Sequence, residues 1–169
     1  MLKLTIGVLR VLLVLNIAAA LFFVVVLAGS YLVEAPLLAH LARKYPASVD
    51  IRAVVDVARL MLVLGLAVVP PAQILLVALL RMVRTVEQGD PFVSANARRL
   101  HAIGWALLVL QLGDMAFGVL AGWIMRLGAQ FGTGWSFSLT GWLGVLLVFV
   151  LARIFAQGTA MREELEMTV

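Results

Sequence analysis

Residues 11–33 read VLLVLNIAAALFFVVVLAGSYLV and contain no charged side chain; Arg10 and Glu34 bound the run. An α-helix rises about 1.5 Å per residue, so roughly 20 apolar residues cross the ~30 Å hydrocarbon core of a bilayer. A second uncharged stretch lies between Arg59 and Arg81. Both stretches are typical of membrane-spanning helices.

Two further apolar stretches each contain one charged residue, Asp114 within residues 102–125 and Arg153 within residues 139–161. We therefore predict an all-α fold, a four-transmembrane-helix bundle that forms a single membrane domain over residues 1–169. The expected helices cover about residues 5–33, 48–86, 91–126 and 138–167.

Composition supports a membrane protein and argues against an enzyme. The chain is 64% hydrophobic and 13% charged, whereas soluble domains carry about 25% charged residues. It contains no cysteine, and its two histidines, His40 and His101, are far apart in sequence. No nucleotide-binding, zinc-protease or serine-hydrolase motif is present. We therefore expect no metal, no cofactor and no catalysis.

Local signals refine the second expected helix. Ser48 is a suitable N-cap for it, and Pro70 and Pro71 near its middle predict a kink, because proline lacks an amide donor. The kink is either a hinge or a static packing feature. The preceding segment, residues 34–47, is either a short interfacial helix or an ordinary polar loop.

Basic residues indicate the orientation, because cytoplasmic loops are enriched in Lys and Arg. With both termini inside, eight basic residues lie inside and five outside. The inner residues are Lys3, Arg10, Arg81, Arg84, Arg98, Arg99, Arg153 and Arg162, and the outer ones are Arg43, Lys44, Arg52, Arg59 and Arg126. We therefore predict cytoplasmic N- and C-termini.

The polar residues within the apolar stretches are candidates for function. A lone carboxylate such as Asp114 costs at least ~2.5 kcal/mol at the centre of a membrane helix, so we expect it to contact Arg153, directly or through Gln111 or water. The pair could handle protons or cations, or it could fix the helix register. Asn16 and Gln111 are expected to form interhelical hydrogen bonds.

Three other features carry structural expectations. Asp56 and Arg59 are three residues apart, which predicts a local pair with Arg59 extending outward to the interface. The pattern Gly118–Gly122 permits close helix packing, within one chain or in a dimer. Trp123, Trp135 and Trp142 are expected to flank the outer membrane boundary as an aromatic belt.

Two motifs carry a family resemblance. The first is Gly89-Asp90-Pro91-Phe92 followed by Asn96 and Arg99-Leu100. The second is Met161-Arg162-Glu163-Glu164 with the ending Glu166-Met167-Thr168-Val169. Together with the chain length and the four expected helices, they make the chain similar to the bacterial membrane family named "domain of unknown function 2975", over nearly its whole length.

The resemblance implies a location in a bacterial inner (cytoplasmic) membrane. It also implies a partner, because members of that family are often encoded beside a small helix-turn-helix DNA-binding protein. It suggests a noncatalytic membrane protein that regulates or sequesters such a regulator through a cytoplasmic loop and tail, without binding nucleic acid itself. Alternatively, loop and tail bind each other, with Arg98 or Arg99 paired to a tail glutamate. The residues for docking or closure are Asp90, Pro91, Phe92, Asn96, Arg98, Arg99, Arg162, Glu163, Glu164 and Glu166.

A second function remains open on the sequence. Asp114, Asn16 and the Pro70–Pro71 kink could line a polar cavity in a small transporter or a ligand-binding channel component. Four short-looped helices leave little room for alternating access in a monomer, so transport would require a homo-oligomer. The sequence leaves the oligomeric state open.

Overall fold

The computed structural model describes residues 2–88, 93–128 and 135–166, and its regular elements in those residues are all α-helices. Their order is α1 (Leu2–Leu32), α2 (Glu34–Lys44), α3 (Ile51–Ala67), α4 (Val69–Glu87), α5 (Ser94–Arg126) and α6 (Leu139–Glu166). Four stretches are long and apolar enough to cross a membrane: Leu2–Leu32, Ile51–Glu87, Ser94–Arg126 and Leu139–Arg162. The predicted all-α class and the four apolar helices are confirmed.

The segment between the first two spans contains a helix, α2, so it is not an ordinary polar loop, and the interfacial position expected for it stays a prediction. α2 carries Glu34 in its first turn and Arg43 and Lys44 in its last turn, an arrangement that complements the helix dipole. The prediction of Ser48 as the next N-cap is wrong. Val49 N–H closes a turn onto the Pro46 carbonyl, 3.0 Å away, so the helix begins later and Asp50 caps it by accepting from Ala53 N–H at 3.1 Å.

The second span is interrupted where the two prolines predicted a kink. α3 ends at Ala67 and α4 begins at Val69, and the Val68 N–H still donates to the Leu64 carbonyl at 3.1 Å. Pro70 and Pro71 cannot donate to the carbonyls four residues before them, so the helical hydrogen-bond ladder fails at this point. The single helix expected over residues 48–86 is therefore two helices.

The helices divide into two compact units. Unit 1 comprises Met1–Asn16, Pro70–Gln111 and Ser138–Val169, and unit 2 comprises Ile17–Val69 and Leu112–Phe137. The boundary passes through α1 and α5 and falls beside the break between α3 and α4.

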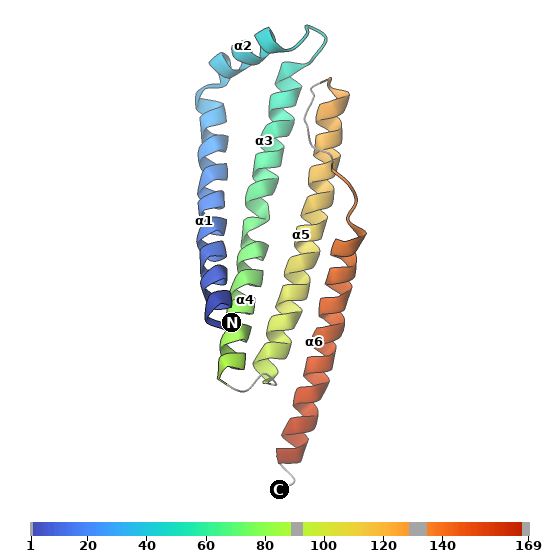
Figure 1. The fold of residues 1–169 in the computed structure, drawn as a ribbon. Helices are drawn as coiled ribbons and strands as arrows, with labels where there is room; N and C mark the ends of the chain where they lie inside the picture. Colours follow the sequence, from blue (N-terminus) through green and yellow to red (C-terminus); the bar gives the residue numbers. More distant parts are fainter. Residues whose placement is uncertain (1, 89–92, 129–134, 167–169) are drawn as a thin grey trace. The chain divides into compact units, whose positions relative to one another are not determined.

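In unit 1, α4 packs against the first half of α1 and the first half of α5, and α6 packs against α5 (Figure 1). Phe149 of α6 packs closely against α5. A Cβ added at Gly104 would lie 2.9 Å from its ring, and His101 and Trp105 meet the ring edge to face at 5.7 and 5.6 Å. A small residue therefore lets the aromatic ring reach the α5 backbone.

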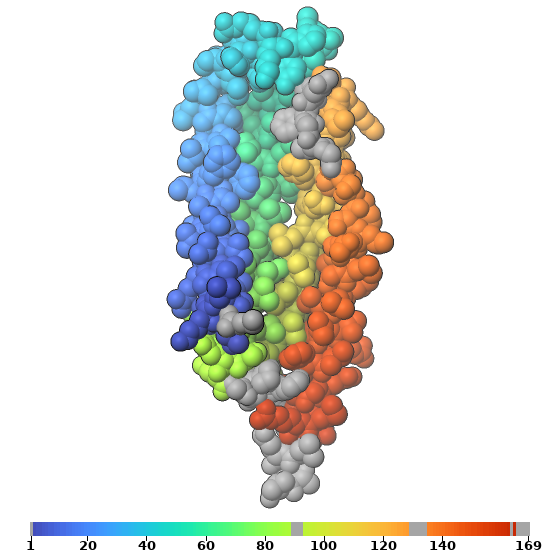
Figure 2. All heavy atoms as spheres, in the orientation of Figure 1, coloured from blue at the N-terminus to red at the C-terminus, as the bar shows by residue number. Residues whose placement is uncertain are grey.

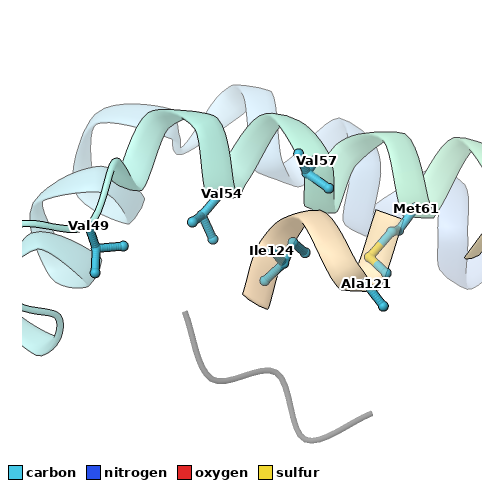
Figure 3. Close-up of a cluster of buried hydrophobic side chains, with 6 residues drawn as sticks. All are labelled: Val49, Val54, Val57, Met61, Ala121 and Ile124. Atoms are coloured by element: carbon cyan, nitrogen blue, oxygen red, sulfur yellow. The ribbon is translucent and has the colours of Figure 1, made fainter. Parts of the chain in front are cut away.

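In unit 2, α3 packs against the second half of α5 through a core of buried apolar side chains (Figure 3). Ile124 of α5 is fully buried and Ala121, one turn earlier, is 2% exposed. They contact α3 side chains at helical spacing. Among the described residues, the buried members of the cluster are Val49, Val54, Val57, Met61, Ala121 and Ile124.

Apolar side chains also cover the outer surface of the helices. Figure 2 shows α1 (blue) largely uncovered on this face, and among its described residues only Leu9 is buried. Leu4, Leu21 and Leu32 are 76%, 64% and 85% exposed. Water would make such a surface aggregate, whereas lipid tails are as apolar as leucine. The fold therefore requires a bilayer around it.

Candidate functional site

A buried polar cluster joins α4 to the start of α5 in unit 1. Asn96 is 1% exposed, and its Nδ2 donates to Thr85 Oγ1 at 2.9 Å. Its Oδ1 accepts from Arg99 Nη1 at 2.8 Å, and the Thr85 hydroxyl bonds back to the Met82 carbonyl at 2.7 Å. A satisfied buried amide fixes the register of a helix pair. Asn96 was expected to take part in docking or closure. It is instead buried between α4 and α5, where it joins the two helices.

Beside this cluster, three arginines line an open groove between α4 and α5. The groove has a volume of about 520 Å³ and is lined by Arg81, Arg98 and Arg99 together with apolar residues that include Ile74 and Val77. Arg81 and Arg98 are exposed, and Arg99 is half-buried. Arg99 Nη1 also donates to the Arg81 carbonyl at 3.3 Å, so the guanidinium is held at the edge of the groove.

The last turns of α6 belong to the same unit as this groove. Thr159 is 5% exposed and its hydroxyl bonds to carbonyls one turn back in α6. Arg153, Arg162 and Glu164 are exposed. The side chains of Glu163 and Glu166, and the whole of Asp90, Pro91 and Phe92, lie outside the described residues. Their expected docking or closure role stays a prediction.

The tightest charged cluster lies in unit 2, around Arg59 of α3. Its guanidinium donates to Glu34 Oε2 at 3.1 Å, to Asp56 Oδ1 at 3.4 Å and to the Ser30 carbonyl at 2.7 Å. Its Nε donates to Ser30 Oγ at 3.2 Å, and the guanidinium lies 3.9 Å from the centre of the Tyr31 ring. One arginine thus ties together α1, α2 and α3.

The prediction for Arg59 was correct only in its partner Asp56. Arg59 is 8% exposed, so it does not extend outward to water. The carboxylate of Glu34 in α2, the carbonyl of Ser30 and the ring of Tyr31 replace the water that this cation would otherwise need. In the sequence, Ser30, Tyr31 and Glu34 lie close together at the junction of α1 and α2. That spacing does not identify Arg59 as the cation that binds them.

Asp114, the carboxylate in the third span, is hydrogen-bonded within unit 2. Trp135 Nε1 donates to Asp114 Oδ2 at 3.2 Å. The same indole covers Gly118, where an added Cβ would overlap the ring, while Gly122 has nothing within 4 Å. At Gly118, the space left by the missing side chain is therefore filled by an indole of the same chain and not by a neighbouring helix.

The contact with Gly118 locates Trp135 along α5, while the expected aromatic belt stays a prediction. Gly118 is eight residues before Arg126, the end of α5, which places Trp135 about 12 Å inward from that end along the helix. Trp135 therefore packs along the span, because its N–H satisfies Asp114 and Gly118 leaves space for its ring. Arg153, the expected partner of Asp114, belongs to unit 1, and that pairing stays a prediction.

The remaining intramembrane polar residues make or approach interhelical contacts within unit 1. Asn16 Nδ2 of α1 donates to Gln73 Oε1 of α4 at 2.8 Å. Gln73 thus bonds to a neighbouring helix, although the prolines two and three residues earlier leave carbonyls short of donors. Gln111 of α5 lies directly against Gly141 of α6, where an added Cβ would overlap its amide. Both amides lie at helix–helix contacts.

Four membrane-crossing helices, an apolar outer surface and satisfied polar clusters inside define a multi-pass integral membrane protein. The chain belongs to the family described as "Protein of unknown function (DUF2975)", whose model matches residues 3–169. The family resemblance carried by the two sequence motifs is thus confirmed. No curated protein and no solved structure matches the chain.

Proposed function

We propose that this protein is a noncatalytic regulator in a bacterial inner membrane that binds or sequesters a small helix-turn-helix transcription regulator at its cytoplasmic face. The partner class comes from the resemblance of the chain to its family. The observation that carries the proposal is the length of α6.

α6 is longer than a membrane crossing requires. Its 28 residues correspond to about 42 Å at ~1.5 Å per residue, against ~30 Å of hydrocarbon. Residues 139–161 contain one charged residue and suffice to cross the hydrocarbon. We therefore infer that the last turns, which carry Arg162, Glu163, Glu164 and Glu166, extend beyond the lipid. DNA-binding proteins hold phosphates through basic side chains. An acidic helix end therefore complements the surface with which such a partner contacts DNA.

The orientation is part of the proposal. Four crossings return the chain to its starting side, so both termini share one compartment. The N-terminus, the α4–α5 connection and the end of α6 belong to unit 1, and the eight-to-five excess of basic residues favours this side as cytoplasmic. A cytoplasmic regulator would then meet the loop and the tail together.

The structure supports a transporter or channel component less well than it supports a regulator. A polar path needs groups free to contact a solute, yet Asn16 is bonded to Gln73 and Asp114 is bonded to Trp135. Both polar groups that the sequence suggested for a cavity thus have protein partners.

Binding to a purified, neighbour-encoded helix-turn-helix protein tests the proposal. The membrane protein is measured in detergent as the full chain, as a form lacking residues 161–169, and as Glu163→Gln/Glu164→Gln/Glu166→Gln. We expect both variants to lose binding. Glu87→Gln, at the exposed end of α4, is the matched control and should bind normally.

Two outcomes would contradict the docking role. Undiminished binding without residues 161–169 removes the tail from the interface. Failure of the full chain to bind, together with a lower melting temperature for the truncated form, supports the alternative in which tail and loop close on each other.

A further inference from the structure

Among the described residues, the lining of the groove between α4 and α5 carries positive charge and no carboxylate. The positive charge comes from Arg81, Arg98 and Arg99. The acceptors described for Arg99 are the Asn96 side-chain oxygen and the Arg81 carbonyl, both neutral. Three arginines thus line one groove, a pattern suited to an anion with several oxygens.

The other part of the groove is apolar. Ile74 and Val77 of α4 line it, and Ile74 is 52% exposed. Seven residues separate Ile74 from Arg81, which corresponds to about 10 Å along the helix. The groove therefore runs from a cationic end at the end of a membrane span to an apolar end within that span.

We propose that this groove binds an anionic phospholipid, with the phosphate at Arg81, Arg98 and Arg99 and the upper part of an acyl chain along Ile74 and Val77. Basic pockets between membrane helices are suited to anionic headgroups. The volume of about 520 Å³ is large enough for a headgroup and the start of a chain. This inference does not depend on the helix-turn-helix partner.

An acidic protein segment fits the groove less well. Carboxylates would neutralise the arginines but would leave Ile74 and Val77 uncovered, whereas a lipid satisfies both ends with one molecule. Arg99 has a second role, because its bond to Asn96 joins the ligand site to the buried contact that sets the α4–α5 register. A bound headgroup would therefore reinforce this helix pair.

Native mass spectrometry of the full-length protein, titrated separately with phosphatidylglycerol and phosphatidylcholine, tests the proposal. We expect preferential binding of phosphatidylglycerol. The variant Arg81→Gln/Arg98→Gln should weaken it roughly 25-fold, at about fivefold for each cation near an anionic lipid. Arg99 is retained because it bonds to Asn96. The matched control is Arg10→Gln/Arg84→Gln, which removes the same charge from two exposed residues outside the groove lining.

A measurement on the unmodified protein keeps the test independent of variant folding. Phosphatidylglycerol with a photoreactive group near the top of one acyl chain should label the α4 peptide containing Ile74 and Val77. Glycerol phosphate, which has the headgroup charge without acyl chains, should compete at least tenfold less well than the lipid.

Three results would overturn the proposal. Equal losses in the two double variants would show general charge attraction in place of a site. Labelling confined to other helices would place the lipid elsewhere. Phosphatidylglycerol binding unchanged in Arg81→Gln/Arg98→Gln, with loss of binding to the helix-turn-helix protein in that variant, would assign the groove to the protein partner.

Discussion

Trp135 donates its indole N–H to the Asp114 carboxylate across 3.2 Å while its ring covers Gly118, one helical turn further along α5. The carboxylate within the third span therefore has a neutral donor from the segment that follows α5. A hydrogen bond to a charged group is stronger than one between neutral groups. The contact also holds Trp135 against the helix.

The Asp114–Trp135 contact should appear as coupling in a double-mutant cycle with Asp114→Asn and Trp135→Phe. We expect a coupling free energy of about 0.5–1.5 kcal/mol, the usual range for polar contacts in membrane proteins, measured by unfolding in mixed detergent micelles. A parallel cycle with Asp114→Asn and Arg153→Gln tests the pair expected from the sequence. Larger coupling in that second cycle would show Arg153 to be the principal partner.

Gly118 and Gly122 should respond differently to a single added methyl group. Gly118→Ala would push its Cβ into the Trp135 ring, so we expect destabilisation of about 1–3 kcal/mol, as for overpacking. Gly122 has nothing within 4 Å, so Gly122→Ala should be neutral or slightly stabilising through helix propensity. Thermal melting of both variants in one detergent measures the difference. Equal effects would mean that the indole does not occupy this position.

The carboxylates around Arg59 should rank in a fixed order. Glu34 is closer to the guanidinium than Asp56, at 3.1 against 3.4 Å, and its side chain is 38% exposed against 60%. Glu34→Gln should therefore cost about 1 kcal/mol, and Asp56→Asn at most ~0.5 kcal/mol, because solvent screens exposed pairs. Chemical unfolding in micelles would reveal the order. A larger loss for Asp56→Asn would contradict this geometry.

Removing Arg59 should cost more than removing either carboxylate. Arg59→Gln leaves Glu34 and the Ser30 carbonyl without their cation in a site where Arg59 is 8% exposed. Loss of one partner from a buried charge pair costs about 3–5 kcal/mol, and the upper part of that range is not expected here because Glu34 reaches solvent. Arg52→Gln, on the same helix and exposed, is the control. An unfolding curve like that of the wild type would refute the role of Arg59 as a tie between helices.

Asn96 should be important for stability although it is polar. Asn96→Ala removes the acceptor of Arg99 and the donor to Thr85, and leaving buried groups unsatisfied costs about 1–3 kcal/mol. Gln88→Ala, at an exposed position after α4, should change the melting temperature little. Hydrogen exchange in the first turns of α5 should also accelerate in Asn96→Ala. Unchanged exchange there would show that Asn96 does not set the register.

Several elements follow from sequence because lipid leaves the chain few choices. An uncharged run such as residues 11–33 cannot expose its backbone polar groups to hydrocarbon, so it must satisfy them internally as a helix. The break before Pro70 follows similarly, since two missing amide donors affect any helix whatever surrounds it. The sequence did not decide between a helix and a loop over residues 34–47, because their charge and apolar spacing fit both.

Contacts between helices depended on information that spacing along the chain does not contain. Ser30 and Glu34 are 29 and 25 residues from Arg59, and a small rotation of α1 or α3 about its own axis would separate them. Trp135 is 21 residues from Asp114, and its position along α5 depends on the space left by Gly118. The family motif singled out Asn96, but nothing in the sequence indicated that its side chain is buried.

Hydrophobicity and proline chemistry thus dictated the helices and the membrane environment, since both act locally on whatever chain carries them. Which polar group meets which was settled by packing. Arg59 bonds to Glu34 and Asp114 bonds to Trp135, because the rotation of the helices and the space left by small residues bring their donor and acceptor atoms within hydrogen-bonding range. In an apolar medium an unpartnered charge is costly, and the folded chain meets that requirement with whichever donor or acceptor its packing brings close.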